Sequence, residues 1–499
     1  MKKIGILALA ALCVMPMKAQ WNIRLEAQGG AASGDHMPLW QNANRYGLGS
    51  VETASGYLRA GAFKPVENDT REWKLGAGVD VAVAAGYTST LIVQQAYGEL
   101  QWKLGRLTVG SKEQPMQLKN QELSSGSQTL GINARPVPGV RLELPDYWNI
   151  PGLNGWLGLK GHIFYGLQTD DAWQKDFTQK QHKYTEHTRL HTKAGYLRIG
   201  REDRPLTVEL GLEMAAQYGG KSVLSDRVIE NRGGLTGMWH AFIPSGGEVT
   251  EEAEYRNAEG NHLGSWVARV SLDYDDWGIA VYGDHYFEDH SAMFMVDYNG
   301  YGTGSAWNKK EKSCYFGYDL KDIMLGAELT LKQTPWLQSI VVEYLYTKYQ
   351  SGPTYNDHSP VKSTHISGMD NYYNHGLFTG WQHWGMVMGN PLYRSPLYNT
   401  DGQVNVQNNR FWAWHLGLSG SPTQQLHYRL LGTVQKGWGT YGRPFANPLR
   451  NVSLMGEVTY SLPKPTSFGH VSVTGAVAMD HGGLLGNNVG AQISLTTRF

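Results

Sequence analysis

The stretch NVGAQISLTTRF at residues 488–499 decides the fold class of this chain. Its odd-numbered positions are mostly apolar and its even-numbered positions mostly polar, so an extended strand here has one apolar and one polar face. A half-buried strand in a soluble protein is usually only about five or six residues long. A longer strand that ends the chain on Phe499 predicts the closing strand of a transmembrane antiparallel β-barrel.

The same alternation recurs along the rest of the chain. It is clear at 208–218, 266–281 and 412–430, where apolar residues occupy every second position, with short turns inside the two longer stretches. With weaker segments included, we expect about eighteen strands, an even number as bacterial barrels require.

Phe499 also sets the direction of every strand if it lies at the periplasmic end. The connections on the periplasmic side are then all short, for example 275–277 and 420–425. The connections on the external side are all long: 111–136, 169–192, 219–264, 288–322, 350–410 and 436–451. Short periplasmic turns with long extracellular loops are the asymmetry of outer-membrane barrels. The sequence therefore predicts an all-β barrel in the cell outer membrane.

Residues 1–19 have the pattern of a secretory signal peptide. Lys2 and Lys3 precede the apolar run 4–14, and the small residue Ala19 suits cleavage. After this segment no apolar run approaches the roughly 18 residues that a membrane helix needs, so any membrane span is expected to be β. Residues 20–499 are predicted to form one barrel domain. Cys314 is the single cysteine after the signal and has no partner for an internal disulfide.

The composition fits a membrane barrel and excludes a nucleic-acid partner. Lys plus Arg equals Asp plus Glu at 44 each, so no strongly basic field is expected. The 28 Tyr and 17 Trp suit membrane interfaces and sugar binding. The mean hydropathy of −0.41 is low for a membrane protein, but in a barrel only alternate strand residues face lipid.

Motifs for catalysis or cofactor binding are scarce. There is no G-x-S-x-G and no H-E-x-x-H, and the G-x-G-x-x-G match at 437–442 is followed by Pro444 and a strand rather than a helix. One predicted loop holds residues that could ligate a metal, although solvated loop histidines explain them more simply: His182, Glu186, His187 and His191. We expect no enzyme activity, no cofactor and no metal.

Carboxylates on the predicted inward faces leave two interpretations open. They could include a hydrolytic pair, or they could form ion pairs in a wet lumen. The acidic residues are Glu99, Glu209, Glu213, Glu328, Glu343 and Glu457, and the expected basic partners are Lys103, Arg269, Arg429 and Arg498.

Several long segments resemble the Bacteroidetes branch of the Wzi-type capsule assembly family. They are SGDHMPLWQNANRYG (33–47), GSQTLGINARPVPGV (126–140), GMWHA (237–241), NHGLFTGWQHWGMVMGNPLYRSP (374–396), RFWAWHLGLSG (410–420) and YRLLGTVQKGWGTYG (428–442). The resemblance covers essentially the whole chain after the signal. It implies an eighteen-stranded outer-membrane barrel with a lectin-like role, which holds capsular or other surface polysaccharide at the outer face. Residues 20–54 show no clear helical periodicity to match the N-terminal periplasmic helices of the enterobacterial members.

The family segments contain the candidate polysaccharide-binding residues. Arg135 lies on a stiff segment before Pro136, which could hold its guanidinium ready for an acidic sugar, or it could form a buried lumen ion pair. The densest aromatic and polar cluster of the longest loop contains Trp381, His383, Trp384, Asn390 and Tyr393, with Trp239 and His240 as second choices. The alternative for each aromatic residue is that it packs the loops into a cap.

Three functional hypotheses follow from these observations. The leading one is a non-enzymatic outer-membrane barrel that binds and retains capsular or surface polysaccharide. Its other expected partners are outer-membrane lipid and the barrel assembly machinery, through the C-terminal strand that ends at Phe499. The second is a diffusion channel or transporter for glycans or small solutes. The third, a surface hydrolase or lipid A-modifying enzyme, rests only on scattered carboxylates and histidines.

Overall fold

The chain forms a closed β-barrel in the computed structural model, which describes residues 21–66, 71–244, 259–288, 296–298, 302–307, 309, 313–316, 321–354, 359–361, 363 and 368–499. The predicted signal peptide at residues 1–19 lies outside the described residues. The wall has 18 strands, which confirms the predicted fold class and strand number. They are β1 (Asn22–Ser33), β2 (Ala54–Lys64), β3 (Trp73–Ala85), β4 (Leu91–Trp102), β5 (Gly105–Ser111), β6 (Gly139–Asn149), β7 (Leu157–Leu167), β9 (Arg189–Ile199), β10 (Leu206–Tyr218), β13 (Asn261–Asp273), β14 (Trp277–Glu288), β17 (Ile323–Leu331), β18 (Ser339–Tyr346), β21 (Phe411–Gly420), β22 (Leu426–Gly439), β23 (Pro444–Ser461), β24 (His470–Gly482) and β25 (Asn488–Arg498).

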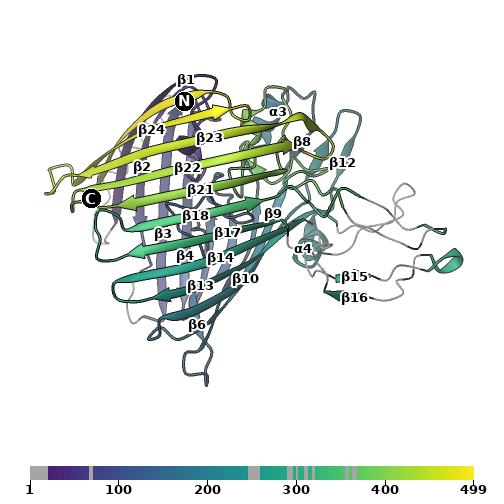
Figure 1. The fold of residues 1–499 in the computed structure, drawn as a ribbon, viewed down its shortest axis with the longest axis horizontal. Coiled ribbons are helices and arrows are strands. Elements are labelled where there is room, and N and C mark those ends of the chain that lie inside the picture. The colour runs from purple at the N-terminus through teal and green to yellow at the C-terminus, as the bar shows by residue number, and fades with distance from the viewer. Residues whose placement is uncertain are drawn as a thin grey trace.

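Each wall strand pairs antiparallel with the wall strands before and after it in the chain (Figure 1). The last strand, β25, pairs with β1 and closes the barrel, with Arg498 opposite Arg24 and Val489 opposite Ser33. Closure removes the open sheet edges, whose backbone N–H and C=O groups lipid could not satisfy. The C-terminal stretch is therefore the closing strand, as predicted.

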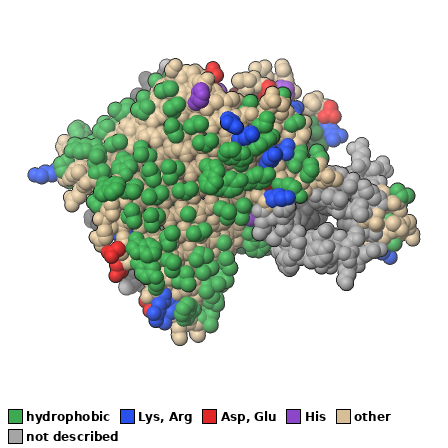
Figure 2. Space-filling model, in the orientation of Figure 1, with side chains coloured by type: hydrophobic (Ala, Val, Ile, Leu, Met, Phe, Trp, Pro, Cys, Tyr) green, Lys and Arg blue, Asp and Glu red, His purple; other side chains and the backbone are tan. Residues whose placement is uncertain are grey.

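The two faces of the wall carry different side chains. In β25, Val489 and Ile493 are 57% and 61% exposed, whereas the alternate residues Asn488 and Gly490 are buried against residues inside the barrel. Figure 2 shows the outward side chains as a broad hydrophobic band across the strands. Such a band is stable in contact with acyl chains and unstable in water, so the outer face of the wall is a lipid-facing surface.

Connections at the two ends of the barrel differ in length. At the end that holds Phe499 they are short: 65–72, 103–104, 150–156, 200–205, 274–276, 332–338, 421–425 and 462–469. The opposite end carries the long connections 34–53, 112–138, 168–188, 219–260, 289–322 and 347–410, together with the turns 86–90, 440–443 and 483–487. The predicted asymmetry is confirmed, and the end with long loops is extracellular.

One predicted loop is wrong. Residues 436–451 were expected to form an extracellular loop, but β22 and β23 remain paired as far as Gly439 opposite Pro444, which leaves only the turn 440–443. Two glycines of this segment, Gly437 and Gly439, serve the strand pairing instead of a loop. A Cβ at Gly437 would lie 2.2 Å from Asn408 Oδ1, and Gly439 has a φ of +78°. They allow the strand to pass close to a neighbouring segment and to turn.

The extracellular connections contain short helices and strands. They are α2 (Leu39–Asn42), α3 (Asp171–Phe177), β8 (Tyr184–Glu186), β11 (Lys221–Val223), β12 (Val228–Glu230), α4 (Gly234–Phe242), β15 (Val296–Tyr298), η1 (Gly304–Ala306), β16 (Ser313–Phe316), β19 (Gln382–His383), β20 (Met386–Val387) and η2 (Pro396–Tyr398). Strands β8, β11 and β12 form a small sheet, and β15–β16 and β19–β20 are separate pairs. In the described residues, no helix is long and apolar enough to cross a membrane.

Charged side chains on the inward face are mostly paired. Two of the expected ion pairs are present: Arg269–Glu328 at 2.8 Å and Arg429–Glu457 at 2.9 Å. Glu99 instead pairs with Lys112, because Lys103 lies in the turn 103–104 with a φ of +52°. Three other inward carboxylates accept hydrogen bonds from tyrosines, in the pairs Tyr147–Glu209, Tyr196–Glu213 and Tyr282–Glu343. The lumen therefore compensates its buried charge internally.

Candidate functional site

Three extracellular connections fold back into the barrel. Each bonds to an inward-facing side chain of the wall: Leu39 N donates to Asp480 Oδ2 at 3.0 Å, His415 Nε2 to Leu123 O at 2.8 Å, and Gln435 Nε2 to Leu392 O at 2.7 Å. These contacts come from residues 34–53, 112–138 and 368–410, which together we call the plug. The plug occupies the lumen, so the barrel is not an open tube.

The segment 112–138 bonds to two buried carboxylates of the wall. Glu343, on the inward face of β18, accepts hydrogen bonds from Ser124 Oγ at 2.6 Å and Ser125 N at 2.8 Å. Asp284, on the inward face of β14, accepts from Lys119 Nζ at 2.8 Å. Both carboxylates are fully buried, and buried charges left without these donors would be strongly destabilising. These hydrogen bonds therefore hold the segment 112–138 against strands β14 and β18.

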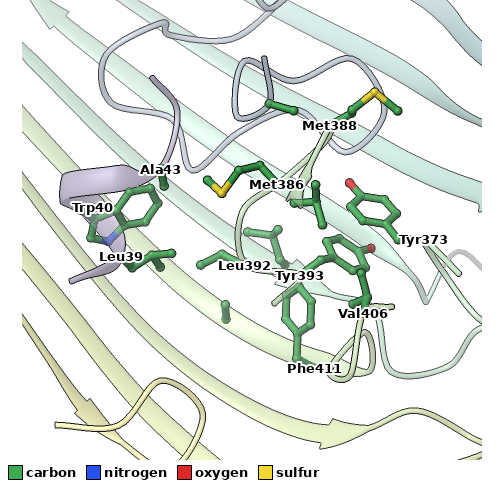
Figure 3. Close-up of a cluster of buried hydrophobic side chains, with 14 of the residues drawn as sticks. Leu39, Trp40, Ala43, Tyr373, Met386, Met388, Leu392, Tyr393, Val406 and Phe411 are labelled. Carbon is green, nitrogen blue, oxygen red and sulfur yellow. The ribbon is translucent and has the colours of Figure 1, made fainter. Parts of the chain in front are cut away.

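Side chains of the segment 368–410 gather in a buried cluster with Leu39, Trp40 and Ala43 of the segment 34–53 (Figure 3). Tyr373 and Tyr393 stack with ring centroids 4.0 Å apart, and Phe411 of β21 meets the Tyr393 ring edge-on at 5.0 Å. Trp381 Nε1 donates to Thr129 O at 2.9 Å. These rings form a buried aromatic core inside the barrel.

Several predicted binding residues belong to this core. Trp381 is 2% exposed, and His383, Asn390 and Tyr393 are 0% exposed. Asn390 Nδ2 donates to Gly126 O at 2.8 Å, so its amide holds two plug segments together. The expectation that these four side chains contact a polysaccharide does not fit their burial. They pack the loops into a cap, which was the alternative interpretation of the loop aromatics.

Arg135, which is 6% exposed, lies against Trp384 at the edge of the plug. The Arg135 guanidinium lies over the indole ring, with Cζ 4.4 Å from its centroid. Its Nη1 and Nη2 donate to Ser89 Oγ at 3.2 Å and to Thr88 Oγ1 at 3.0 Å. Trp384 is partly exposed, and its Nε1 donates to Thr169 Oγ1 at 3.2 Å. We call these five residues, which come from four different connections, the arginine–tryptophan site.

Buried groups behind the site hold it in place. Burial lowers the pKa of His383, so its ring is neutral at physiological pH. His383 Nε2 can then accept a hydrogen bond from Thr169 N at 3.1 Å while Nδ1 donates to Arg135 O at 2.8 Å. Trp384 N donates to Asp170 Oδ2 at 3.1 Å. His383 is therefore a positioning residue that ties the backbones of two site residues together.

The Arg135 charge has no carboxylate partner in the part of the chain that the structure describes. Burial lowers its pKa to about 10, and the nearby Asp170 only partly opposes this effect. Arg135 Nε is buried and has no hydrogen-bond acceptor among the described residues. The alternative interpretation, a buried lumen ion pair, has no support among the described residues. A guanidinium over an aromatic ring, beside hydroxyl groups, suits a carboxylate-bearing sugar.

A cavity of about 150 Å³ lies between the plug and the wall. Its polar lining includes Lys112, Arg135, Arg141, His162, Thr192 and Tyr196. At roughly 15 Å³ per water on this scale, it has room for on the order of ten water molecules. The cavity borders the inner side of the site. No sequence signal marks its wall residues or Thr88, Ser89 and Thr169, because single hydroxyl and charged residues on strands and in turns form no motif.

Trp239 and His240 lie elsewhere, on α4. This helix packs on the outward face of the wall, where Tyr165 Oη donates to Met238 O at 3.1 Å. Trp239 is 58% exposed, and His240 Nδ1 is 2.9 Å from Glu259 Oε2. The structure therefore does not bring these two second-choice residues into the arginine–tryptophan site.

The loop residues considered as metal ligands do not converge. Glu186 pairs with Lys175 at 2.7 Å, and His187 lies 3.3 Å from Asp171. His191 is a wall residue of β9, with Nδ1 2.9 Å from Phe164 O. Among the described residues, no group of three or more His, Cys, Asp or Glu is arranged to hold a metal ion.

Comparison with known proteins supports the fold. No protein-family model matches the sequence, and no curated protein matches it. The chain is similar to the structure of Wzi from Escherichia coli, described as an outer membrane protein involved in group 1 capsule assembly and as a carbohydrate-binding β-barrel. The two share 13% identity over 99% of this chain and 88% of that chain, with a TM-score of 0.56.

Two Pseudomonas aeruginosa barrels are more distant. OccK5 (OpdH) shares 9% identity over 96% of this chain and 98% of that chain, with a TM-score of 0.46. OprD shares 8% identity over 97% of this chain and 95% of that chain, with a TM-score of 0.45. Scores this low carry no argument about this chain. Its own closed 18-stranded wall, apolar outward band and one-sided long loops make it an outer-membrane β-barrel protein.

Proposed function

We propose that this barrel binds and retains capsular or another acidic surface polysaccharide at the cell surface, without catalysing a reaction. The observation that carries the proposal is the Arg135 guanidinium, held over Trp384 with no ion-pair partner among the described residues. The ring offers an apolar face to a sugar, and the guanidinium offers paired donors to its carboxylate. The similarity in fold to a carbohydrate-binding barrel agrees with this role.

The test is retention of polysaccharide on cells that lack the protein. Deletion is expected to move stained polysaccharide from the cell surface to the medium, and the intact chain should restore it. The double variant Arg135→Ala/Trp384→Ala should fail to restore it, whereas Trp239→Ala, which removes an exposed ring outside the site, should succeed. If deletion leaves the amount of cell-attached polysaccharide unchanged, the proposal is wrong.

A second candidate function is diffusion or transport of glycans or small solutes. The observation that favours it is the polar, ion-paired inward face of the wall. The plug opposes it, because 112–138 crosses the lumen and bonds to β14 and β18. Transport would require the plug to move, at the expense of buried hydrogen bonds to Glu343 and Asp284.

A further inference from the structure

A group of cations lies on the outer wall at the extracellular rim. Lys436 and Arg450 are register neighbours on β22 and β23, and Lys436 is also opposite Trp412 of β21. Gln435, beside Lys436, points inward to Leu392 O, so Lys436 points outward like Val434. Two further cations flank these strands, Lys348 just after β18 and Arg410 just before β21. We call Lys348, Arg410, Lys436 and Arg450 the rim patch.

Aromatic rings support three of these cations. Lys348 Nζ lies 4.3 Å and Lys436 Nζ 5.2 Å from the Trp438 ring centroid. Arg410 Cζ lies 3.7 Å from the Tyr441 ring centroid, and Arg410 Nε donates to Lys348 O at 3.1 Å. The rings hold the aliphatic parts of these side chains close to the wall, and the charged groups lie together at the rim.

The charge of the rim patch is not neutralised within the described residues, since none of its four cations forms an ion pair with a described Asp or Glu. At the opposite end of the barrel, Lys332 pairs with Asp273 at 2.7 Å and Arg201 with Asp203 at 2.8 Å. Figure 2 shows Lys and Arg side chains gathered where the hydrophobic band ends on the loop side. The patch therefore presents a positive field to whatever lies above the acyl chains.

We propose that the rim patch binds the phosphate groups of a phosphorylated glycolipid in the outer leaflet. The outward columns that lead to the patch are apolar: Trp414, Leu416, Val434 and Leu454 are all well exposed on the wall. Acyl chains cover such side chains, so the layer directly beyond them is the headgroup layer. Cations at this level meet lipid phosphates before they meet a free polymer. This inference is independent of the proposed polysaccharide site.

The test measures, by native mass spectrometry, the binding of lipid A to the purified full-length barrel in detergent. The probes are bisphosphorylated lipid A and the same lipid with its phosphates removed. The phosphorylated lipid is expected to bind on the order of 10-fold more tightly, and Lys348→Gln/Lys436→Gln should abolish that preference. Lys332→Gln, at the periplasmic end, should keep it. Circular dichroism of each variant establishes that the barrel is folded.

Three outcomes would overturn the proposal. The first is an equal affinity of the unchanged barrel for both lipids. The second is tight binding of inorganic phosphate alone, which would assign the patch to a free anion. The third is a folded double variant that keeps the lipid preference but loses affinity for a lipid-free acidic polysaccharide. Arg135→Ala is expected to leave lipid binding unchanged, so failure of the polysaccharide site and failure of the rim patch are distinguishable.

Discussion

The Arg135 guanidinium is a destabilising feature of the folded barrel as well as a candidate ligand contact. Its pKa is lowered because a buried cation with only hydroxyl oxygens and a ring around it is less well solvated than in water. Groups kept in such surroundings are commonly functional, since a packed apolar side chain would be more stable there.

Replacing Arg135 by Met is expected to separate binding from stability. Affinity for an acidic polysaccharide should fall by about 10-fold or more, because a charge-assisted contact is lost. The thermal midpoint should stay the same or rise. Arg269→Met is the matched contrast, because it leaves Glu328 without its partner and should lower the midpoint. A drop in midpoint for Arg135→Met with unchanged affinity would make Arg135 a purely structural residue.

The lowered pKa of Arg135 also predicts opposite pH trends for binding and folding. Below about pH 10 the guanidinium is charged, so affinity for a carboxylated glycan should hold and then decline as the pH rises through about 10. The unfolded chain keeps its proton to higher pH, so this group's contribution to the stability of the fold increases over the same range. Affinity and stability are measured against pH for the unchanged chain and for Arg135→Met, and the difference between the two profiles isolates the effect of the guanidinium. Identical profiles for the two proteins would contradict it.

At the scale of elements, strand β25 and helix α4 show how differently local sequence determines position. β25 alternates so regularly that its register with β1 and β24 leaves one apolar face outward. Helix α4 lies in a connection without such a pattern, and contacts to Tyr165 and to strands β9 and β10 place it outside the barrel. Trp239 therefore sits beside the lipid-facing wall, although its sequence context resembled that of the plug tryptophans.

The C-terminal Phe499 supports a prediction about assembly. Its backbone extends the β25–β1 pairing, since Ile23 N donates to Phe499 O at 3.3 Å, and its side chain is 49% exposed. Deleting Phe499 is expected to lower the amount of folded barrel in the outer membrane, because the assembly machinery is expected to engage this strand. Phe468→Ala removes an exposed aromatic ring at the same end and should leave the amount unchanged. Equal amounts for the deletion and the intact chain would refute this role.

At the scale of the whole molecule, a closed wall surrounds an inward plug. The wall alone resembles a channel, with ion pairs such as Arg269–Glu328 and Arg429–Glu457 on its inner face. The plug changes this, because its aromatic core and its bonds to Glu343 and Asp284 occupy the space that a solute would cross.

Conductance in planar bilayers is the measurement that separates the two candidate functions. The intact barrel is expected to conduct poorly. Replacing residues 118–130 by a short Gly–Ser linker removes the contacts to Asp284 and Glu343 and should produce larger, frequent openings. Deleting 224–227, a turn in an outer hairpin, is the control and should leave conductance low. High, steady conductance of the intact barrel would favour the channel.

The sequence by itself determined the barrel class, the strand number, the closing strand and the end that carries the long loops. These properties follow from alternation within each strand, because every second side chain meets lipid whatever the distant chain does. It also singled out Arg135 and Trp384, although not the hydroxyl residues that complete their site.

The tertiary structure alone decided which loop residues are exposed. Trp381 and Trp384 are three residues apart in the same aromatic stretch, yet one is buried against Thr129 and the other lies under Arg135 at the surface. Whether a loop tryptophan packs or stays accessible depends on partners about 250 positions away, which come together only after the barrel closes. Local sequence cannot carry that information, since the same residue types serve both environments.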